Sequence, residues 1–144
     1  FGPLGMRTAV LEADDSGTFV GSSFGFASAR DWARLGLLYA DDGMVGDVPI
    51  LPHGWVAAAR RCAAGGDGRF GLHLWLDQDP DGDGPADREW PDLPADVFHM
   101  DGHEGQFVVV IPSRQLVVVR LGCTKNGGFD LRGLVRRVLR ALPD

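Results

Sequence analysis

The chain has 144 residues, of which 44% are hydrophobic and 24% charged, and its formal net charge is −6. This length and balance are typical of one globular domain with a single core. An acidic chain does not fit a nucleic-acid-binding surface, because neutralising phosphates requires clustered Lys and Arg. No apolar run reaches the ~18 residues of a membrane span. We therefore expect neither nucleic acid nor a membrane as a partner.

The N-terminus and the cysteines indicate little about where the protein functions. The chain begins "FGPLGM", without an initiator Met, and we expect it to be a fragment of a longer chain. A preceding part could carry a signal peptide, so localisation, bacterial cytoplasmic or secreted, stays open. Cys62 and Cys123 are too few for a disulfide scaffold, and we expect buried thiols, although one bridge between them stays open.

The first half of the chain predicts mainly helices. Residues 1–27 predict loops with one short strand within 17–26. Residues 28–42 predict a helix, with Ser28 as its N-cap and Gly43 ending it. Its apolar face consists of Trp32, Leu35, Leu38 and Tyr39.

An irregular link over 44–52 and a shorter helix over 53–63 come next.

The second half predicts a sheet closed by a helix. Residues 69–76 predict a strand and 77–96 a long loop. Residues 105–112 and 115–121 predict two strands that are apolar enough to be covered on both faces. A terminal amphipathic helix follows over 130–144, with an apolar stripe of Leu131, Leu134, Val135, Val138, Leu139 and Leu142. The order predicts a single α+β domain over 1–144, with helices packed on an antiparallel sheet.

The acidic loop resembles a calcium-binding loop only in part. Asp77, Asp79 and Asp81 occupy the first ligand positions and Gly82 the turn position, but Arg88 stands where the final Glu belongs. An acidic surface loop is the better interpretation. The four histidines have no zinc-binding spacing. We expect no metal and no cofactor.

The segment "MDGHEGQ", residues 100–106, is the sharpest candidate for chemistry. Glycines before a strand let a ligand approach the backbone, and N–H groups there could stabilise an oxyanion. The alternative is a turn that only leads into a strand. Residues 21–25, "GSSFG", match the letters of G-x-S-x-G, but we expect Ser22 and Ser23 in a turn before the helix and no nucleophile elbow. The sequence has no Ser-x-x-Lys motif, so none of its serines has a lysine base one helical turn away.

Four segments together resemble a known family. In order, "FGPLGM", "GSSFGFASARDWARLGLLYADDGMVGDVPILPHGWV", "FGLHLWL" and "MDGHEGQFVVVIPSRQLVVVRLG" resemble the C-terminal portion of penicillin-recognising serine hydrolases. The nearest branch is the class C β-lactamase-like group, which includes esterases and 6-aminohexanoate-dimer hydrolases. The resemblance covers almost the whole chain. It implies the C-terminal part of a β-lactamase-like fold, which has an active site between a mixed α/β part and a helical part.

The resemblance also implies roles for particular residues. The family nucleophile, a Ser of Ser-x-x-Lys, and an assisting Tyr are absent, since Tyr39 lies on an apolar helix face. The family Lys-Thr-Gly triplet matches Met100-Asp101-Gly102, and the backbone N–H of His103 becomes an oxyanion-hole donor. The resemblance places Ser22, Ser23 and Phe24 near the substrate pocket. Without the triplet lysine, an ester or amide is favoured over a β-lactam.

The resulting expectation is a C-terminal fragment of a serine hydrolase that acts through an acyl-enzyme on a small-molecule ester, amide or β-lactam-like bond. Without the nucleophile, this chain alone would be inactive. The alternative is a non-catalytic domain that binds a partner or associates with itself through exposed apolar surface.

Overall fold

The computed structural model describes residues 1–62, 68–78, 88–125 and 128–143. Over these residues the chain is an α+β structure, as the sequence predicts. A four-stranded antiparallel sheet has the strand order β5-β6-β7-β8, and two two-stranded hairpins lie outside it. The elements are β1 (Val10–Leu11), β2 (Gly25–Phe26), α1 (Ala29–Ala40), β3 (Met44–Val45), β4 (Val48–Pro49), α2 (Trp55–Ala59), β5 (Trp75–Leu76), β6 (Phe98–Gly102), β7 (Gln106–Ile111), the 3-10 turn η2 (Pro112–Arg114), β8 (Leu116–Arg120) and α3 (Leu131–Ala141).

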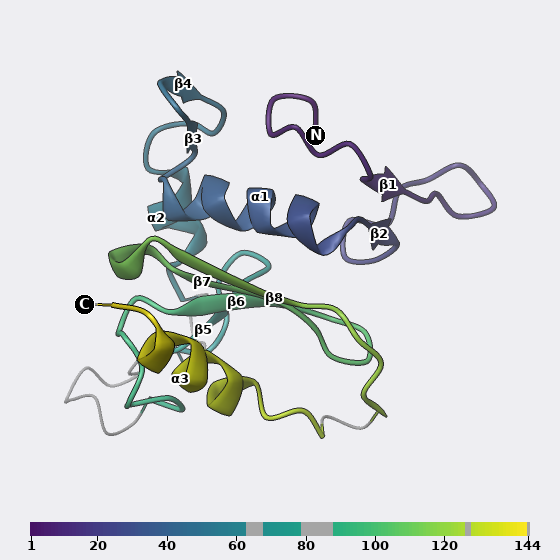
Figure 1. Ribbon diagram of the computed structural model, residues 1–144. Coiled ribbons are helices and arrows are strands. Elements are labelled where there is room, and N and C mark those ends of the chain that lie inside the picture. The colour runs from purple at the N-terminus through teal and green to yellow at the C-terminus, as the bar shows by residue number, and fades with distance from the viewer. Residues whose placement is uncertain (63–67, 79–87, 126–127, 144) are drawn as a thin grey trace.

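The sheet is the middle of three layers. Helix α1 lies on one face and α3 on the other (Figure 1). Because side chains alternate along a strand, β7 contributes to two cores. Val109 and Ile111 pack with Leu131 and Val135 of α3, and Val108 and Val110 pack on the α1 side. The prediction that these apolar strands are covered on both faces is confirmed.

Helix α1 begins as predicted. The Ser28 hydroxyl accepts a hydrogen bond from the Asp31 N–H at 3.3 Å, which caps the helix, and Gly43 follows its end with φ +87°. The Asp31 carboxylate is buried and accepts bonds from the N–H and hydroxyl of Thr8, which tie the N-terminal segment to the helix. These bonds lower the pKa of Asp31.

Helix α3 also follows the prediction closely. Asp130 caps it by accepting from the Gly133 N–H at 2.7 Å. Leu131 and Val135 are fully packed against the sheet. Leu142, which we predicted to belong to the same stripe, is 41% exposed because the helix ends before it, so that part of the prediction is wrong.

The main difference from the sequence prediction is strand β6. Residues 98–102 are a strand paired with β7 from Phe98↔Val110 to Gly102↔Gln106. The segment "MDGHEG" therefore does not simply precede a hairpin. Its first half is strand, and 103–105 form the turn between β6 and β7. Polar side chains at His99 and Asp101 hid the strand from the hydrophobic pattern.

Shorter elements also differ from their predicted bounds. Residues 44–49 form the hairpin of β3 and β4 rather than an irregular link, with Gly46 at φ +56° in its turn. The strand predicted over 69–76 shrinks to β5. The chain folds back on itself between Phe70 and Trp75, because His73 has φ +55° and the Gly71 N–H donates to the Leu74 carbonyl at 2.9 Å, so the stretch is not one continuous strand.

Two more predictions are corrected in their extent. The helix predicted over 53–63 is the single-turn α2. The strand expected within 17–26 is β2, which pairs with an unpredicted partner, β1.

Asp77, the first ligand position of the candidate calcium loop, is engaged in hydrogen bonds to other residues. One carboxylate oxygen of Asp77 accepts from Arg88 at 2.7 Å and the other from the Trp90 N–H at 3.0 Å. Arg88 also donates to the carbonyls of Asp77, Leu93 and Pro94. Both charged groups are buried, so Asp77 is engaged in an ion pair that closes the loop. Asp79, Asp81 and Gly82 lie outside the described residues.

The close packing between α1 and the sheet predicts that adding a single methyl group at Gly36 lowers stability. A Cβ added to Gly36 would lie 2.5 Å from Val117 Cγ1. We expect Gly36→Ala to lower the free energy of unfolding by about 1–2 kcal/mol, because overpacking outweighs the ~1 kcal/mol helix preference for Ala. Urea denaturation measures it. The matched control is Gly21→Ala, where a Cβ meets nothing within 4 Å. Equal stability of both variants would contradict the close contact.

Candidate functional site

The candidate site begins at an incomplete sheet edge. β5 pairs with β6 only at Trp75↔His99 and Leu76↔Phe98. Beyond that point, Met100 to Gly102 have no strand on their outer side within the described part of the chain. Their outward backbone groups are available to a ligand or to another chain segment. The edge is therefore open where the resemblance places its site triplet.

The turn after β6 has a defined backbone geometry. The Gly105 N–H donates to the Gly102 carbonyl oxygen at 3.2 Å. Glu104 and Gly105 follow with φ +58° and +84°. The peptide joining Gly102 to His103 is planar and trans, so its N–H points opposite to its carbonyl. The His103 N–H is thus directed away from the interior of the turn.

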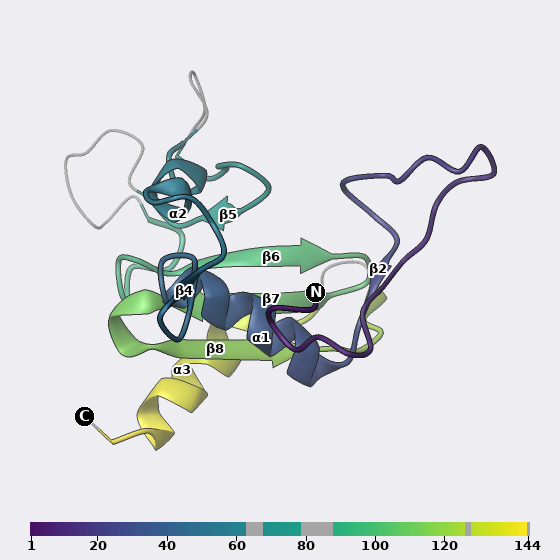
Figure 2. The same cartoon turned by 90° about the horizontal axis from the view of Figure 1, so that it is seen from above.

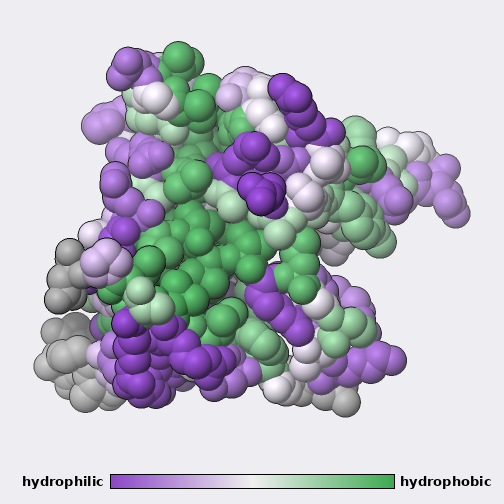
Figure 3. All heavy atoms as spheres, in the orientation of Figure 1, coloured by the Kyte–Doolittle hydropathy of each residue, from purple (hydrophilic) through white to green (hydrophobic). Residues whose placement is uncertain are grey.

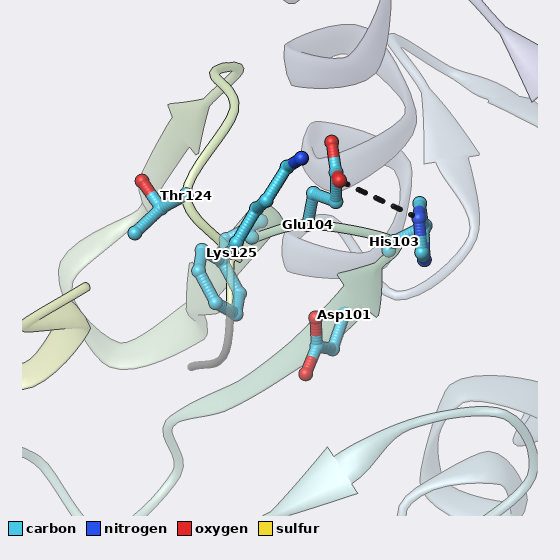
Figure 4. Close-up of a pocket in the computed structure, with 8 residues that line it drawn as sticks. Asp101, His103, Glu104, Thr124 and Lys125 are labelled. Atoms are coloured by element: carbon cyan, nitrogen blue, oxygen red, sulfur yellow. Dashed lines mark ion pairs between the residues drawn. The ribbon is translucent and has the colours of Figure 1, made fainter. Parts of the chain in front are cut away.

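An open cavity of about 450 Å³ adjoins this turn. Figure 4 shows Asp101, His103 and Glu104 from the β6 side of it, and Thr124 and Lys125 from the segment that follows β8. The side chain of His103 is 94% exposed, so what the turn presents in a fixed position is backbone rather than imidazole. The cavity is lined by Asp101, Gly102, His103, Glu104, Gly105, Phe107, Thr124 and Lys125.

Charges of both signs surround the cavity. Partial burial raises the pKa of Asp101 above its usual range. Glu104 accepts a bond from the Cys123 thiol at 3.0 Å and lies 3.9 Å from the His103 ring nitrogen. The bond to Glu104 raises the pKa of Cys123. Lys125 is the only lysine in the sequence.

The structure brings together three of the predicted site residues. Asp101, Gly102 and His103 all line the cavity. Met100 does not line it, since it packs in the core on the α1 side of the sheet.

Ser22, Ser23 and Phe24 are exposed in the turn before β2 and are also absent from the lining. Figures 1 and 2 place β2 at the same end of the molecule as the β6–β7 turn. The sequence-based prediction missed five lining residues, which are Glu104, Gly105, Phe107, Thr124 and Lys125. Lys125 could have been noticed from the sequence because it is the only lysine there.

The described residues offer no metal site, disulfide or membrane-spanning helix. They hold no group of three or more His, Cys, Asp or Glu side chains placed to bind a metal ion. Cys62 and Cys123 form no disulfide, and Cys123 is exposed rather than buried as expected. No helix in the described ranges is long and apolar enough to cross a bilayer.

Comparison with known proteins adds no family. No protein-family model matches the chain, and no curated protein matches it.

His99, in the middle of β6, is held between two indoles. Its ring stacks on Trp90, with centroids 5.1 Å apart, and on Trp75, 6.4 Å apart. Burial lowers the pKa of His99 to about 4, against the opposing effect of the Asp77 carboxylate. The ring is therefore neutral at neutral pH and serves packing rather than proton transfer.

This depressed pKa predicts a pH dependence of stability. Between pH 6.5 and 4 the unfolded chain binds a proton at His99 that the folded chain does not, so stability falls as the pH falls through this window. The difference of 2.5 pH units corresponds to about 3 kcal/mol. We expect His99→Phe to remove this part of the loss in urea denaturation at pH 7 and pH 4. His53→Gln, at an exposed position, is the control, and equal pH dependence in all three proteins would refute the assignment.

Proposed function

We propose that the chain is the sheet-bearing C-terminal part of a β-lactamase-like serine hydrolase that cleaves an ester or amide bond through an acyl-enzyme. The observation that carries the proposal is the stretch from Asp101 to His103. It lies on an open strand edge, it lines a cavity, and it ends in an N–H directed out of its turn.

The chemistry follows from the direction of that N–H. Acyl transfer develops negative charge on a carbonyl oxygen, and fixed N–H donors stabilise it. In this proposal the His103 N–H is one such donor, and the edge of β6 aligns the substrate. Gly102, which has no side chain, lets the reacting carbonyl approach the backbone.

The rest of the catalytic machinery comes from outside these residues. The sequence contains no Ser-x-x-Lys, so in this proposal another part of the chain supplies the nucleophile and its base. Met100 occupies the place of the family lysine and packs into the core. This favours an ester or amide substrate over a β-lactam, whose carboxylate that lysine would bind.

The proposal predicts a backbone-specific effect at residue 103. We expect the protein from the complete reading frame to be labelled by a fluorophosphonate and to hydrolyse a short-chain chromogenic ester, whereas residues 1–144 alone do neither. His103→Pro deletes the N–H and should lower kcat about 100- to 1000-fold. The φ of His103 is not positive, so Pro is compatible with its place in the turn.

The matched control is His103→Ala, which keeps the N–H and should retain nearly full activity. A complete protein that is neither labelled nor active would refute the hydrolase. Equal rates for the Pro and Ala variants would refute the donor.

A second candidate function rests on the other sheet edge. β8 pairs only with β7 among the described strands. Figure 3 shows apolar side chains gathered between α1 and α3, over β8. An apolar, unpaired strand edge is a template for pairing with another chain. This favours a non-catalytic role in which two copies associate through β8.

If two copies pair through β8, the average molar mass in solution should rise with protein concentration. We expect light scattering of residues 1–144 to show a dimer that Leu121→Lys, at the residue directly after β8, disrupts. Leu142→Lys is the matched control, because Leu121 and Leu142 are 43% and 41% exposed. A monomer at all concentrations, or equal loss of dimer in both variants, would contradict pairing through β8.

A further inference from the structure

We propose that Arg120 and Gln106 are positioning residues that hold the 103–105 turn in the conformation that directs the His103 N–H outward. The inference rests on the proposed function, since it assigns residues to the same oxyanion donor. Neither side chain lines the cavity, so each would act through the backbone of the turn.

Gln106 joins the turn to the segment after β8. Its amide nitrogen donates to the His103 carbonyl at 3.2 Å and also to the Gly122 carbonyl. Its amide oxygen accepts from the Gly122 N–H at 2.9 Å. One side chain thereby satisfies both backbone groups of Gly122 and fixes the peptide plane between His103 and Glu104.

Arg120 fixes the rest of the turn. Its guanidinium donates to the Gly105 carbonyl, to the Glu104 carbonyl at 3.5 Å and to the Thr124 hydroxyl. The Glu104 carbonyl also accepts from the Thr124 N–H at 2.9 Å. With the bond from Gln106 of β7, every carbonyl of the turn accepts a hydrogen bond.

The surroundings of Arg120 are shaped for a guanidinium. A Cβ at Gly105 would lie 2.8 Å from it, and a Cβ at Gly122 would lie 2.7 Å from it. The Phe129 ring lies against it, 4.3 Å from centroid to guanidinium carbon. Two glycines and an aromatic face therefore form a flat slot. A lysine ammonium fits this slot poorly, because it cannot donate to several acceptors in one plane.

The orientation of the donor follows from these bonds through Gly105. The His103 N–H shares a peptide with the Gly102 carbonyl, which accepts from the Gly105 N–H at 3.2 Å. Arg120 and Gln106 hold the three carbonyls that follow, so they keep Gly105 where its N–H fixes that peptide. The turn also contains Glu104 at φ +58°, a conformation that a non-glycine residue adopts only at some cost. The bonds from Arg120 and Gln106 offset that cost. Without them the turn should relax to other conformations.

The experiment has a structural arm and a kinetic arm. In the structural arm, nitrogen-15 NMR of residues 1–144 follows the amides of residues 103–105. We expect sharp single resonances in the unsubstituted chain and broadened or doubled ones in Arg120→Gln and Arg120→Lys. Arg114→Gln, at an exposed arginine of η2, is the control and should leave them unchanged. If Arg120→Gln fails to fold, Thr124→Val removes one acceptor of Arg120 without altering the strand. Unchanged turn amides in every folded variant would overturn the proposal.

In the kinetic arm, the complete protein carries the same substitutions. We expect Arg120→Gln to lower kcat for the ester about 10- to 100-fold with KM within about twofold, because the donor is misplaced while substrate binding is kept. A rise in KM with kcat unchanged, or unchanged kcat, would overturn the positioning role. If the unsubstituted complete protein is inactive, the proposed function fails, and the structural arm still decides whether Arg120 fixes the turn.

Discussion

Burial of the central strands on both faces is the constraint from which the rest of the structure follows. Val109, Val110 and Ile111 of β7 are completely shielded from solvent. Consecutive residues point to opposite faces, so the strand needs cover on both sides, which α1 and α3 provide. Gly36 brings α1 close enough for this contact. With both faces covered, a ligand can reach the sheet only at its edges and at the ends of its strands.

The candidate site occupies one of those remaining places. At the end of β6 the edge is open and the chain turns back through residues 103–105. A turn in this position could be loose, but Arg120 and Gln106 engage all of its carbonyls. The same buried sheet thus supplies a rigid base from which the His103 N–H faces outward, as an oxyanion donor must. Charge at the cavity comes from the side chains of Asp101, Glu104 and Lys125.

The sequence predicts local features well and cooperative ones poorly. The Ser28 cap and the apolar run over 105–112 follow from spacing alone, and both are confirmed. β6 was missed because its polar residues are accommodated by distant partners, as His99 is by its two indoles. Lys125 was missed because it reaches the site only through the return of β8. The triplet and the His103 donor came from resemblance to a family, and their roles stay predictions.

A structure of the complete protein with a fluorophosphonate bound tests the central claim most directly. The measured quantity is the distance from the phosphonyl oxygen to the His103 backbone nitrogen. We predict about 2.7–3.1 Å, the range for a donor placed at the oxyanion, with the phosphorus bonded to a serine from outside residues 1–144. A phosphonate bound with its oxygen away from the β6–β7 turn would contradict the account.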